Sequence, residues 1–218
     1  IGDVHQSMGE YAKALPNYEK ALEIQRQSLP ANHLDLATRY NSIGNVYYHM
    51  REYAKALSNY KEALVIQQQS LPENHLDLAS PYYDIGLAYY YMGEYAKALF
   101  YLKKSLEIQE QSLPINHVNL AYAYYFIGRL YQSMGEDARA LFNFEKAFEI
   151  EQQILPGNHG DVAVIYARFA LIEETWKNYA KAVSFIEKSI NIAEKMFSPN
   201  DPRQEQYKNI LDRLKSKI

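Results

Sequence analysis

The feature that most constrains this chain is a short stretch that returns at one fixed interval. Its best copy, residues 71–79, reads LPENHLDLA. Leu-Pro begins each copy, at residues 29, 71, 113 and 155, and Asn-His follows at residues 32, 74, 116 and 158, so successive copies are 42 residues apart. A diverged copy, residues 197–201, lies at the next expected place. A period of this length is typical of a solenoid, in which every repeat packs against its neighbours.

Each period contains two amphipathic helical patterns. In the first, Tyr40, Ile43, Gly44 and Tyr47 share one helical face, because they follow the spacing i, i+3, i+4 and i+7. The same face returns at residues 82, 85, 86 and 89 and at residues 124, 127, 128 and 131. The second pattern runs from about residue 53 to residue 70, and its apolar positions are Ala56, Leu57, Tyr60, Ala63, Leu64 and Ile66.

Turn residues separate these patterns. Met-Gly-Glu-Tyr stands between them at residues 8–11 and 92–95, and Met-Arg-Glu-Tyr at residues 50–53. Glycine is the expected helix terminator, because it accepts the left-handed conformation. Leu-Pro ends the second helix, and we expect Asn74 and Asp77 to cap or favour the start of the next one.

Two prolines fall inside the helical patterns. Pro16 and Pro81 each lie within the first two turns of a predicted helix. Proline removes a backbone donor and clashes with the preceding turn, so we expect local distortion at both positions, but no break.

These residues resemble a known repeat. Tyr-x2-Ile-Gly-x2-Tyr at residues 40–47, followed by Ala-x3-Tyr-x2-Ala at residues 56–63, is similar to the tetratricopeptide repeat, with Tyr where Trp is commonest. The usual repeat has about 34 residues. The longer period and the Leu-Pro-x-Asn-His joint resemble the repeats of kinesin light chains. The resemblance implies an all-α fold of about eleven helices, a tetratricopeptide-like right-handed superhelical solenoid of antiparallel helix pairs.

We expect the whole chain, residues 1–218, to form a single solenoid. Its parts are a partial repeat (1–30), four repeats (31–72, 73–114, 115–156 and 157–198) and a C-terminal capping helix (199–218). The fourth repeat departs most, because Ala170 replaces the glycine and Glu173 replaces the tyrosine. One face of the last segment carries Tyr207, Ile210, Leu211, Leu214 and Ile218, and the other is charged, as a capping helix requires. The chain starts in mid-repeat without Met, so we expect it to be a fragment of a longer protein.

Composition argues against several classes of function. A formal net charge of −3 gives no basic footprint for nucleic acid. No apolar run reaches the roughly 18 residues that suggest a membrane span. The absence of cysteine removes disulfides, zinc–thiolate sites and thiol nucleophiles, and fits a reducing compartment. We therefore expect a cytoplasmic protein without nucleic-acid or membrane partners.

The recurring histidines, His33, His75, His117 and His159, invite a metal interpretation. Packed helices lie about 8–10 Å apart, however, and residues of successive repeats are at least that far from one another. A zinc ion needs all its ligands within about 2 Å. We therefore interpret the histidines as structural residues of the joint.

No catalytic motif is visible in the chain. It contains neither Gly-x-Ser-x-Gly, nor a glycine-rich phosphate loop, nor His-Glu-x-x-His. We predict no catalytic residue, no metal and no cofactor, so the chain is not expected to be an enzyme.

One face of the first helix changes at every copy, whereas the packing face stays nearly constant. In the first full repeat this variable stripe comprises Thr38, Asn41, Asn45 and Tyr48, roughly 130° from the packing face. Its successors are Ser80, Tyr83, Leu87 and Tyr90, then Tyr122, Tyr125, Arg129 and Gln132, and finally Val164, Ala167, Leu171 and Glu174. Neutral drift on an exposed face is the alternative explanation. We favour a binding surface, because tyrosines accumulate there beside Tyr91 and Phe126.

In the resembling family this stripe lines a concave groove that holds peptides. The predicted groove residues are Asn41, Asn45, Tyr48, Tyr83, Leu87, Tyr90, Tyr122, Tyr125 and Arg129. The tyrosines would supply apolar area, and Asn41, Asn45 and Arg129 would fix the peptide by hydrogen bonds. Of the basic and amide clamp found in chaperone-tail-binding members, only Asn45 matches. Arg129 and Arg168 are the isolated counterparts of the basic residues with which kinesin light chains hold acidic cargo peptides.

The sequence therefore predicts a non-catalytic scaffold that binds a partner protein or peptide, of a kinesin-light-chain-like cargo or adaptor type. A second hypothesis is a regulatory or oligomerising arm of a larger enzyme whose catalytic domain lies outside the fragment. A third is self-association through the open ends of the solenoid.

Overall fold

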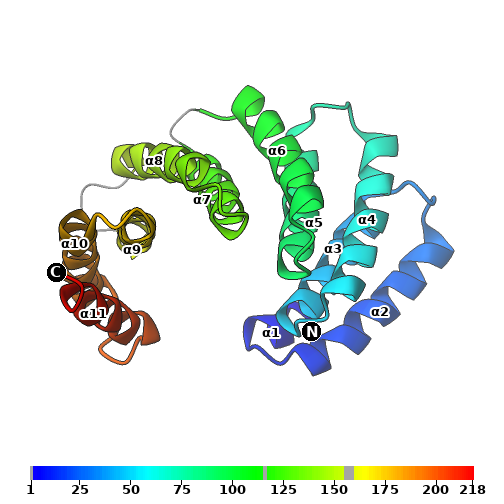
Figure 1. The fold of residues 1–218 in the computed structure, drawn as a ribbon. Helices are drawn as coiled ribbons and strands as arrows, with labels where there is room; N and C mark the ends of the chain where they lie inside the picture. The colour runs from blue at the N-terminus through cyan, green and yellow to red at the C-terminus, as the bar shows by residue number, and fades with distance from the viewer. Residues whose placement is uncertain (1, 115–116, 155–159) are drawn as a thin grey trace. The chain divides into compact units, whose positions relative to one another are not determined.

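The computed structural model describes residues 2–114, 117–154 and 160–218. These residues form eleven α-helices and one short 3-10 helix, η1, and contain no strand (Figure 1). The elements are α1 (Gly2–Ser7), α2 (Tyr11–Ser28), α3 (Leu34–His49), α4 (Tyr53–Ser70), η1 (Leu76–Leu78), α5 (Ala79–Tyr91), α6 (Tyr95–Ser112), α7 (Val118–Ser133), α8 (Asp137–Ile154), α9 (Gly160–Thr175), α10 (Tyr179–Met196) and α11 (Pro202–Lys215). The all-α prediction is confirmed.

Consecutive helices pack as antiparallel pairs joined by three-residue turns. The pairs are α1 with α2, α3 with α4, α5 with α6, α7 with α8 and α9 with α10, and α11 packs on α10. We call the leading member of each pair the first helix and its partner the second helix. The predicted apolar stripe of the second helix is confirmed in α4, where all six of its residues are buried.

The chain divides into two compact units, residues 1–112 and residues 113–218. Unit 1 contains α1 to α6, and a core cluster joins buried side chains of α2, α3 and α4. Unit 2 contains α7 to α11, and a core cluster joins buried side chains of α9, α10 and α11.

A glycine in the first helix lets the second helix approach closely. A Cβ atom added at Gly44 would lie 2.5 Å from Tyr60, and one at Gly128 would lie 2.7 Å from Phe144. Such separations are impossible for real atoms, so each glycine is required while the facing side chain stays large. In the fourth repeat Ala170 takes the place of the glycine, and the facing position holds the smaller Ile186, which is buried in the same core cluster.

The turn within each pair needs one residue in the left-handed conformation. Gly9, Gly93 and Gly135 have φ values of 73°, 77° and 74° there. Arg51 and Lys177 hold the same position with φ values of 62° and 61°. The predicted glycine terminator is confirmed, and the two exceptions carry backbone strain because a Cβ atom is disfavoured in this region.

Histidine caps the first helix in three described repeats. The backbone N–H groups of Asp35, Asp77 and Asn119 donate to Nδ1 of His33, His75 and His117, at 3.2, 3.3 and 3.2 Å. Each bond provides an acceptor for one of the backbone N–H groups that have no partner within the first turn of the helix. The histidines therefore have the structural role that we expected.

The joint differs from the prediction in its capping residue. The N-cap is His75 rather than Asn74, because the imidazole Nδ1 reaches the second N–H of the helix; Asp77 lies in the first turn, as predicted. Residues 115–116 and 155–159, which include Asn116, Asn158 and His159, lie outside the described residues.

The two prolines act differently. Helix α2 continues through Pro16 without a break. Before Pro81 the chain forms η1, and α5 begins only at Ala79, so that Pro81 lies in the first turn of α5. The expected distortion is thus confirmed at Pro81, where a 3-10 turn replaces the first α-helical turn.

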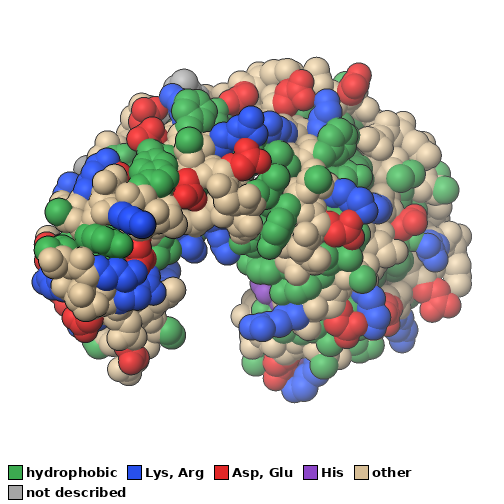
Figure 2. Space-filling model, viewed as in Figure 1, with side chains coloured by type: hydrophobic (Ala, Val, Ile, Leu, Met, Phe, Trp, Pro, Cys, Tyr) green, Lys and Arg blue, Asp and Glu red, His purple; other side chains and the backbone are tan. Residues whose placement is uncertain are grey.

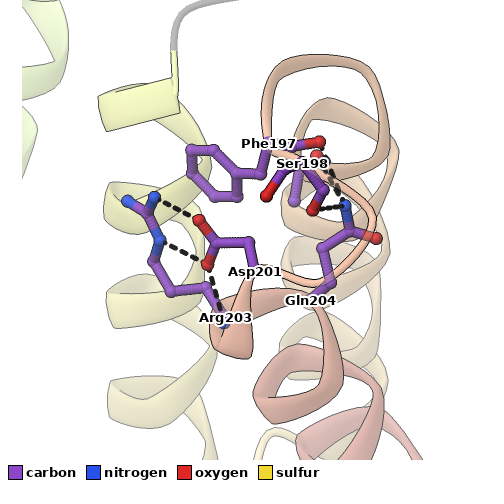
Figure 3. A network of polar contacts seen from close by, with 6 residues as sticks. Phe197, Ser198, Asp201, Arg203 and Gln204 are labelled. Carbon is purple, nitrogen blue, oxygen red and sulfur yellow. Dashed lines mark hydrogen bonds and ion pairs between the residues drawn. The ribbon is translucent and has the colours of Figure 1, made fainter.

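Asp201 begins α11 at the position that histidine holds in earlier joints. Its Oδ1 accepts the backbone N–H of Arg203 at 2.9 Å, and the guanidinium donates to both carboxylate oxygens at 2.9 and 2.6 Å (Figure 3). These hydrogen bonds lower the pKa of Asp201 to about 2. Gln204 Nε2 also donates to the backbone oxygen of Ser198 at 3.1 Å, so the joint and the helix start are held together (Figure 3).

Helix α11 covers the end of the α9–α10 pair. Tyr207, Ile210 and Leu214 are buried, as predicted, whereas Ile218 lies beyond the helix and is 76% exposed, so that its predicted place on the packing face was wrong. Arg213 and Lys217 each bind Glu174 of α9 at 2.7 Å.

Replacing Arg51 by Gly should raise the free energy of unfolding by roughly 1 kcal/mol, because glycine adopts the left-handed φ without a Cβ clash. Gly93→Ala, the reverse change at the equivalent turn, should lower it by a similar amount. Urea unfolding followed by circular dichroism measures both. Shifts of the same sign in the two variants would contradict the assigned strain.

Replacing His75 by Ala should lower the free energy of unfolding by about 1 kcal/mol, because the N–H of Asp77 loses its acceptor. His75→Asp should keep most of the stability, since Asp201 performs the same task at α11. Thermal unfolding of the two variants tests this, and equal losses in Ala and Asp would contradict the capping role.

Candidate functional site

In unit 1 part of the predicted stripe is used for packing. Asn45 Oδ1 accepts a hydrogen bond from the hydroxyl of Tyr60 at 2.8 Å, and Tyr60 is 1% exposed. Leu87, at the equivalent position of α5, is buried. The helix that pairs with α5, α6, carries Leu102 where α4 carries Tyr60. Because no buried hydroxyl needs an acceptor in this pair, the position equivalent to Asn45 can hold the apolar Leu87.

The tyrosines of unit 1 form an aromatic cluster at the ends of α3 and α5. The ring of Tyr91 lies 5.6 Å from Tyr48, edge to face, and is stacked on Tyr53 at 5.1 Å. Tyr90 lies 5.2 Å from Tyr91 and 6.0 Å from Tyr95. Figure 2 shows apolar and tyrosine side chains gathered over α5 and the adjoining end of α3. Burial, together with a hydrogen bond to Tyr91, raises the pKa of Tyr48, a half-buried residue whose ring packs on Tyr91.

Three further predicted residues of unit 1 also keep partial access to solvent. Tyr83, Tyr90 and Asn41 are half-buried. The Oδ1 atom of Asn41 is buried without a hydrogen-bond partner among the described residues.

In unit 2 the predicted stripe borders a cavity of about 220 Å³. Its walls come from three helices: Tyr122, Tyr125 and Phe126 of α7, Glu151 of α8, and Asp161 and Val164 of α9. Tyr122 and Tyr125 were predicted from the sequence, and the structure brings them together with Val164 of the next stripe.

Two acidic side chains line this cavity. Glu151 is 2% exposed. The hydroxyl of Tyr122 donates to Asp161 Oδ2 at 3.2 Å. Burial first, and the carboxylate of Asp161 second, raise the pKa of Tyr122. The phenol thus stays neutral at physiological pH.

Basic side chains lie beside the cavity-lining residues Tyr125 and Phe126. The guanidinium carbon of Arg129 is 5.4 Å from the ring centroid of Phe126 and 5.9 Å from that of Tyr125. Arg168 Nε lies 3.4 Å from the hydroxyl of Tyr125. The predicted groove residue Arg129 therefore stacks on aromatic rings beside the cavity.

Sequence reasoning missed two acidic residues. Glu151 lies on a second helix, outside the stripe that we selected; the signal that points to it is the Gln found at the equivalent residues 25, 67 and 109. Asp84 follows Tyr83 on α5, and burial raises its pKa to about 7, against a smaller opposite effect of a hydrogen bond from Ser80. Its equivalents are Ser42, Phe126 and Arg168, so variability also marked this position.

The described residues hold no group of three or more His, Cys, Asp or Glu side chains that could bind a metal ion. None of the described helices combines the length and the apolar character that crossing a membrane requires.

The family model of the tetratricopeptide repeat matches four overlapping stretches, residues 1–69, 37–111, 77–153 and 119–195. The chain belongs to the tetratricopeptide repeat family. Its helix pairs are thus tetratricopeptide repeats lengthened to 42 residues, with the predicted Tyr in place of Trp. Among curated proteins, none matches the chain.

Solved structures share this tetratricopeptide fold. BtubC (BKLC) from P. vanneervenii has a TM-score of 0.79 at 23% identity, over 93% of this chain and 81% of that one. The kinesin light chain TPR-like repeats from Podosopora anserina have a TM-score of 0.75 at 19% identity, over 90% and 94%. YrrB, a TPR protein with an unusual peptide-binding site, has a TM-score of 0.59 at 22% identity, over 95% and 88%. The predicted repeat of kinesin light chain type is confirmed at the level of fold.

Asp84→Asn should remove a pH dependence of stability. The carboxyl of Asp84 has a pKa of about 7 in the folded chain, against an ordinary value of 3.8, so folding retains a proton that the unfolded chain loses. The wild type should therefore lose roughly 2–4 kcal/mol between pH 4 and pH 8 relative to the variant. Urea unfolding across this range measures it. Glu62→Gln, at an exposed carboxylate, is the control, and identical pH profiles of wild type and Asp84→Asn would contradict the burial.

Proposed function

We propose that this tetratricopeptide repeat chain is a non-catalytic scaffold that binds a segment of a partner protein along its first helices. The family supports an interaction role, because its helix pairs present a side-chain surface without requiring catalytic groups. A cytoplasmic location, predicted from the cysteine-free composition, belongs to the same proposal.

One observation carries the proposal. The cavity of unit 2 opens on the stripe that sequence variation selected, at Tyr122, Tyr125 and Val164. Pockets for drug-sized ligands have volumes of roughly 300–1,000 Å³. A cavity of about 220 Å³ is smaller, and it suits a single side chain of a bound segment.

The aromatic walls suit such an anchor. Tyr122 is 41% exposed, so a partner can cover its ring on binding. Aromatic residues that surround a buried anchor commonly provide much of the binding energy of an interface. The peptide-binding site of YrrB, a protein of related fold, supports the same kind of use.

Unit 1 offers a separate candidate contact surface. We propose Tyr83, Tyr90 and Asn41 for it, because these residues keep partial access to solvent. The sequence also indicated Asn45, Tyr48 and Leu87. Asn45 and Tyr48 are half-buried as well, but Asn45 accepts the hydrogen bond of Tyr60 and Tyr48 packs on Tyr91, whereas Leu87 is buried, so we propose a supporting role for these three. In unit 2, Arg129 would hold a carbonyl or carboxylate of the segment beside the cavity.

Binding can be tested by selecting a phage-displayed library of random 12-residue peptides on the immobilised chain. Tyr122→Ala should weaken the selected peptides about tenfold or more, because it removes an aromatic wall. Val164→Tyr should do the same by filling the cavity, and it has a precedent in Tyr122, its equivalent one repeat earlier. Fluorescence anisotropy measures the affinities.

Phe142→Ala is the matched control. Phe142 is 56% exposed on α8 and does not line the cavity, so its loss should leave peptide affinity unchanged. Circular dichroism should show unchanged helicity in all three variants. A library without binders, or binders that ignore both Tyr122→Ala and Val164→Tyr, would overturn the proposed site.

A further inference from the structure

One turn of unit 1 keeps a cation where the neighbouring turns have glycine. Arg51, between α3 and α4, has a φ value of 62°, and the equivalent residues 9 and 93 are glycines. Every side chain is disfavoured in this conformation, and Asn and Asp tolerate it best after glycine. The residue found here is instead large and basic, so the needs of the turn do not explain it.

The same replacement occurs in unit 2. Lys177, in the turn between α9 and α10, has a φ value of 61°. Each of the two cations follows a large apolar side chain that is exposed, Met50 (37%) and Trp176 (42%). The C-terminal end of a helix attracts a cation, but that attraction is equally available at the turns that keep glycine. Both departures from glycine therefore indicate a use for the positive charge itself.

The side chain of Arg51 has no partner within the described part of the chain. It is exposed, and it forms no hydrogen bond, ion pair or ring contact there. Asp84, whose charge acts on Tyr48, is half-buried on α5. Each turn of unit 1 also carries one glutamate that binds the lysine three residues further on: Glu10, Glu52 and Glu94. The charge of Arg51 is therefore available to a partner.

Arg51 lies beside a partly exposed aromatic surface. Tyr48 and Tyr53, which bracket its turn, both contact the ring of Tyr91, at 5.6 and 5.1 Å. Tyr91 is 41% exposed, and the next residue, Met92, is 38% exposed. The three turns of unit 1 lie at the same end of their helix pairs (Figure 1). An unpaired cation and exposed apolar side chains thus meet at one edge of unit 1.

This combination fits a partner segment in which an acidic residue stands beside an apolar one. A guanidinium can bind a carboxylate through two parallel hydrogen bonds. Such a pair is weak in open water, but apolar side chains that are covered beside it exclude water and strengthen it. Aromatic rings add contact area, and methionine adapts to the shape of what covers it.

We propose that the turn edge of unit 1, formed by Met50, Arg51, Tyr91 and Met92, binds an acidic and apolar segment of a partner protein. The carboxylate pairs with Arg51, and the adjacent apolar side chain lies on Tyr91 and Met92. This surface belongs to the turns and helix ends, whereas the proposed function uses the face of the first helices. The proposal therefore goes beyond that function and does not rest on the cavity of unit 2.

The experiment selects a phage-displayed library of random 12-residue peptides on the complete wild-type chain and removes the phage that also bind Arg51→Gly. Glycine occupies the equivalent position of the neighbouring turns, so this variant should fold and should be more stable than wild type. The remaining peptides are synthesised in their selected form and with each Asp or Glu replaced by its amide. Fluorescence anisotropy then gives their affinities for wild type and for each variant.

The selected peptides should carry an acidic residue next to an apolar one. Arg51→Gly should weaken them about fivefold to tenfold although it stabilises the fold, a combination that a purely structural role of Arg51 does not produce. The amide peptides should bind wild type and Arg51→Gly equally, because their charge pair is already absent. Raising the salt concentration should weaken the acidic peptides more than the amide peptides.

Lys20→Ala is the matched control for charge. Lys20 is an exposed cation of α2 that likewise has no partner within the described part of the chain, so its removal changes the net charge by the same amount. Peptide affinity should be unchanged in this variant. It should also be unchanged in Val164→Tyr, which alters only the cavity of unit 2.

Four results would overturn the proposal. The library could yield no peptide that depends on Arg51, or the dependent peptides could lack an acidic residue. Lys20→Ala could weaken them as much as Arg51→Gly, which would assign the effect to net charge. Light scattering could also show self-association that Arg51→Gly abolishes, which would assign the turn edge to a second copy of the chain. None of these results bears on the proposed function, which Tyr122→Ala and Val164→Tyr test separately.

Discussion

The close approach of two helices at a glycine is the contact on which each repeat depends. Because Gly44 has no side chain, Tyr60 can lie directly against the backbone of α3, and Gly128 admits Phe144 in the same way. This contact fixes which faces of the pair are buried, and so which faces can vary. Where the glycine is lost, at Ala170, the facing residue is the smaller Ile186. Glycine is also kept at Gly86, which faces Leu102 and where an added Cβ atom would lie 2.7 Å from that side chain, so the size of the facing residue alone does not decide where glycine is needed.

The fourth repeat shows how a departure is accommodated. In three repeats a cation lies over a tyrosine ring: Lys55 over Tyr47 at 5.3 Å, Lys97 over Tyr89 at 5.3 Å and Arg139 over Tyr131 at 5.6 Å. In the fourth, Glu173 replaces the tyrosine, and Lys181 forms an ion pair with it. Asn178 also donates to Glu173 at 2.9 Å, so this carboxylate, 1% exposed, is bound from two sides. A cation–π contact has become an ion pair between the buried Glu173 and the exposed Lys181 without loss of the fold.

Local periodicity was enough to predict the helices, the joint and the buried stripe of α4, because these depend on residues three or four apart. The hydrogen bond of Asn45 and the place of Glu151 in the cavity wall could not be predicted in this way. Asn45 is explained by a hydroxyl on another helix, and Glu151 by a cavity whose walls come from three helices. The raised pKa of Asp84 comes from its burial, which the sequence does not show. Variation along the stripe thus led to residues that border the cavity of unit 2, but in unit 1 part of it reflects packing.

The hydrogen bond between Tyr60 and Asn45 restricts the order in which such a repeat can diverge. If Asn45 mutated first, the hydroxyl of Tyr60, on a side chain that is 1% exposed, would lose its partner at a cost of about 1–3 kcal/mol. If Tyr60 first became Phe or Leu, the half-buried Asn45 could still bind water. An evolutionary path therefore replaces Tyr60 of the second helix before it replaces Asn45 of the first helix. Two other repeats lack both members of this pair and hold Leu87 with Leu102 and Arg129 with Phe144. Once the hydroxyl of the second helix is lost, the facing residue of the first helix can change under selection by a partner.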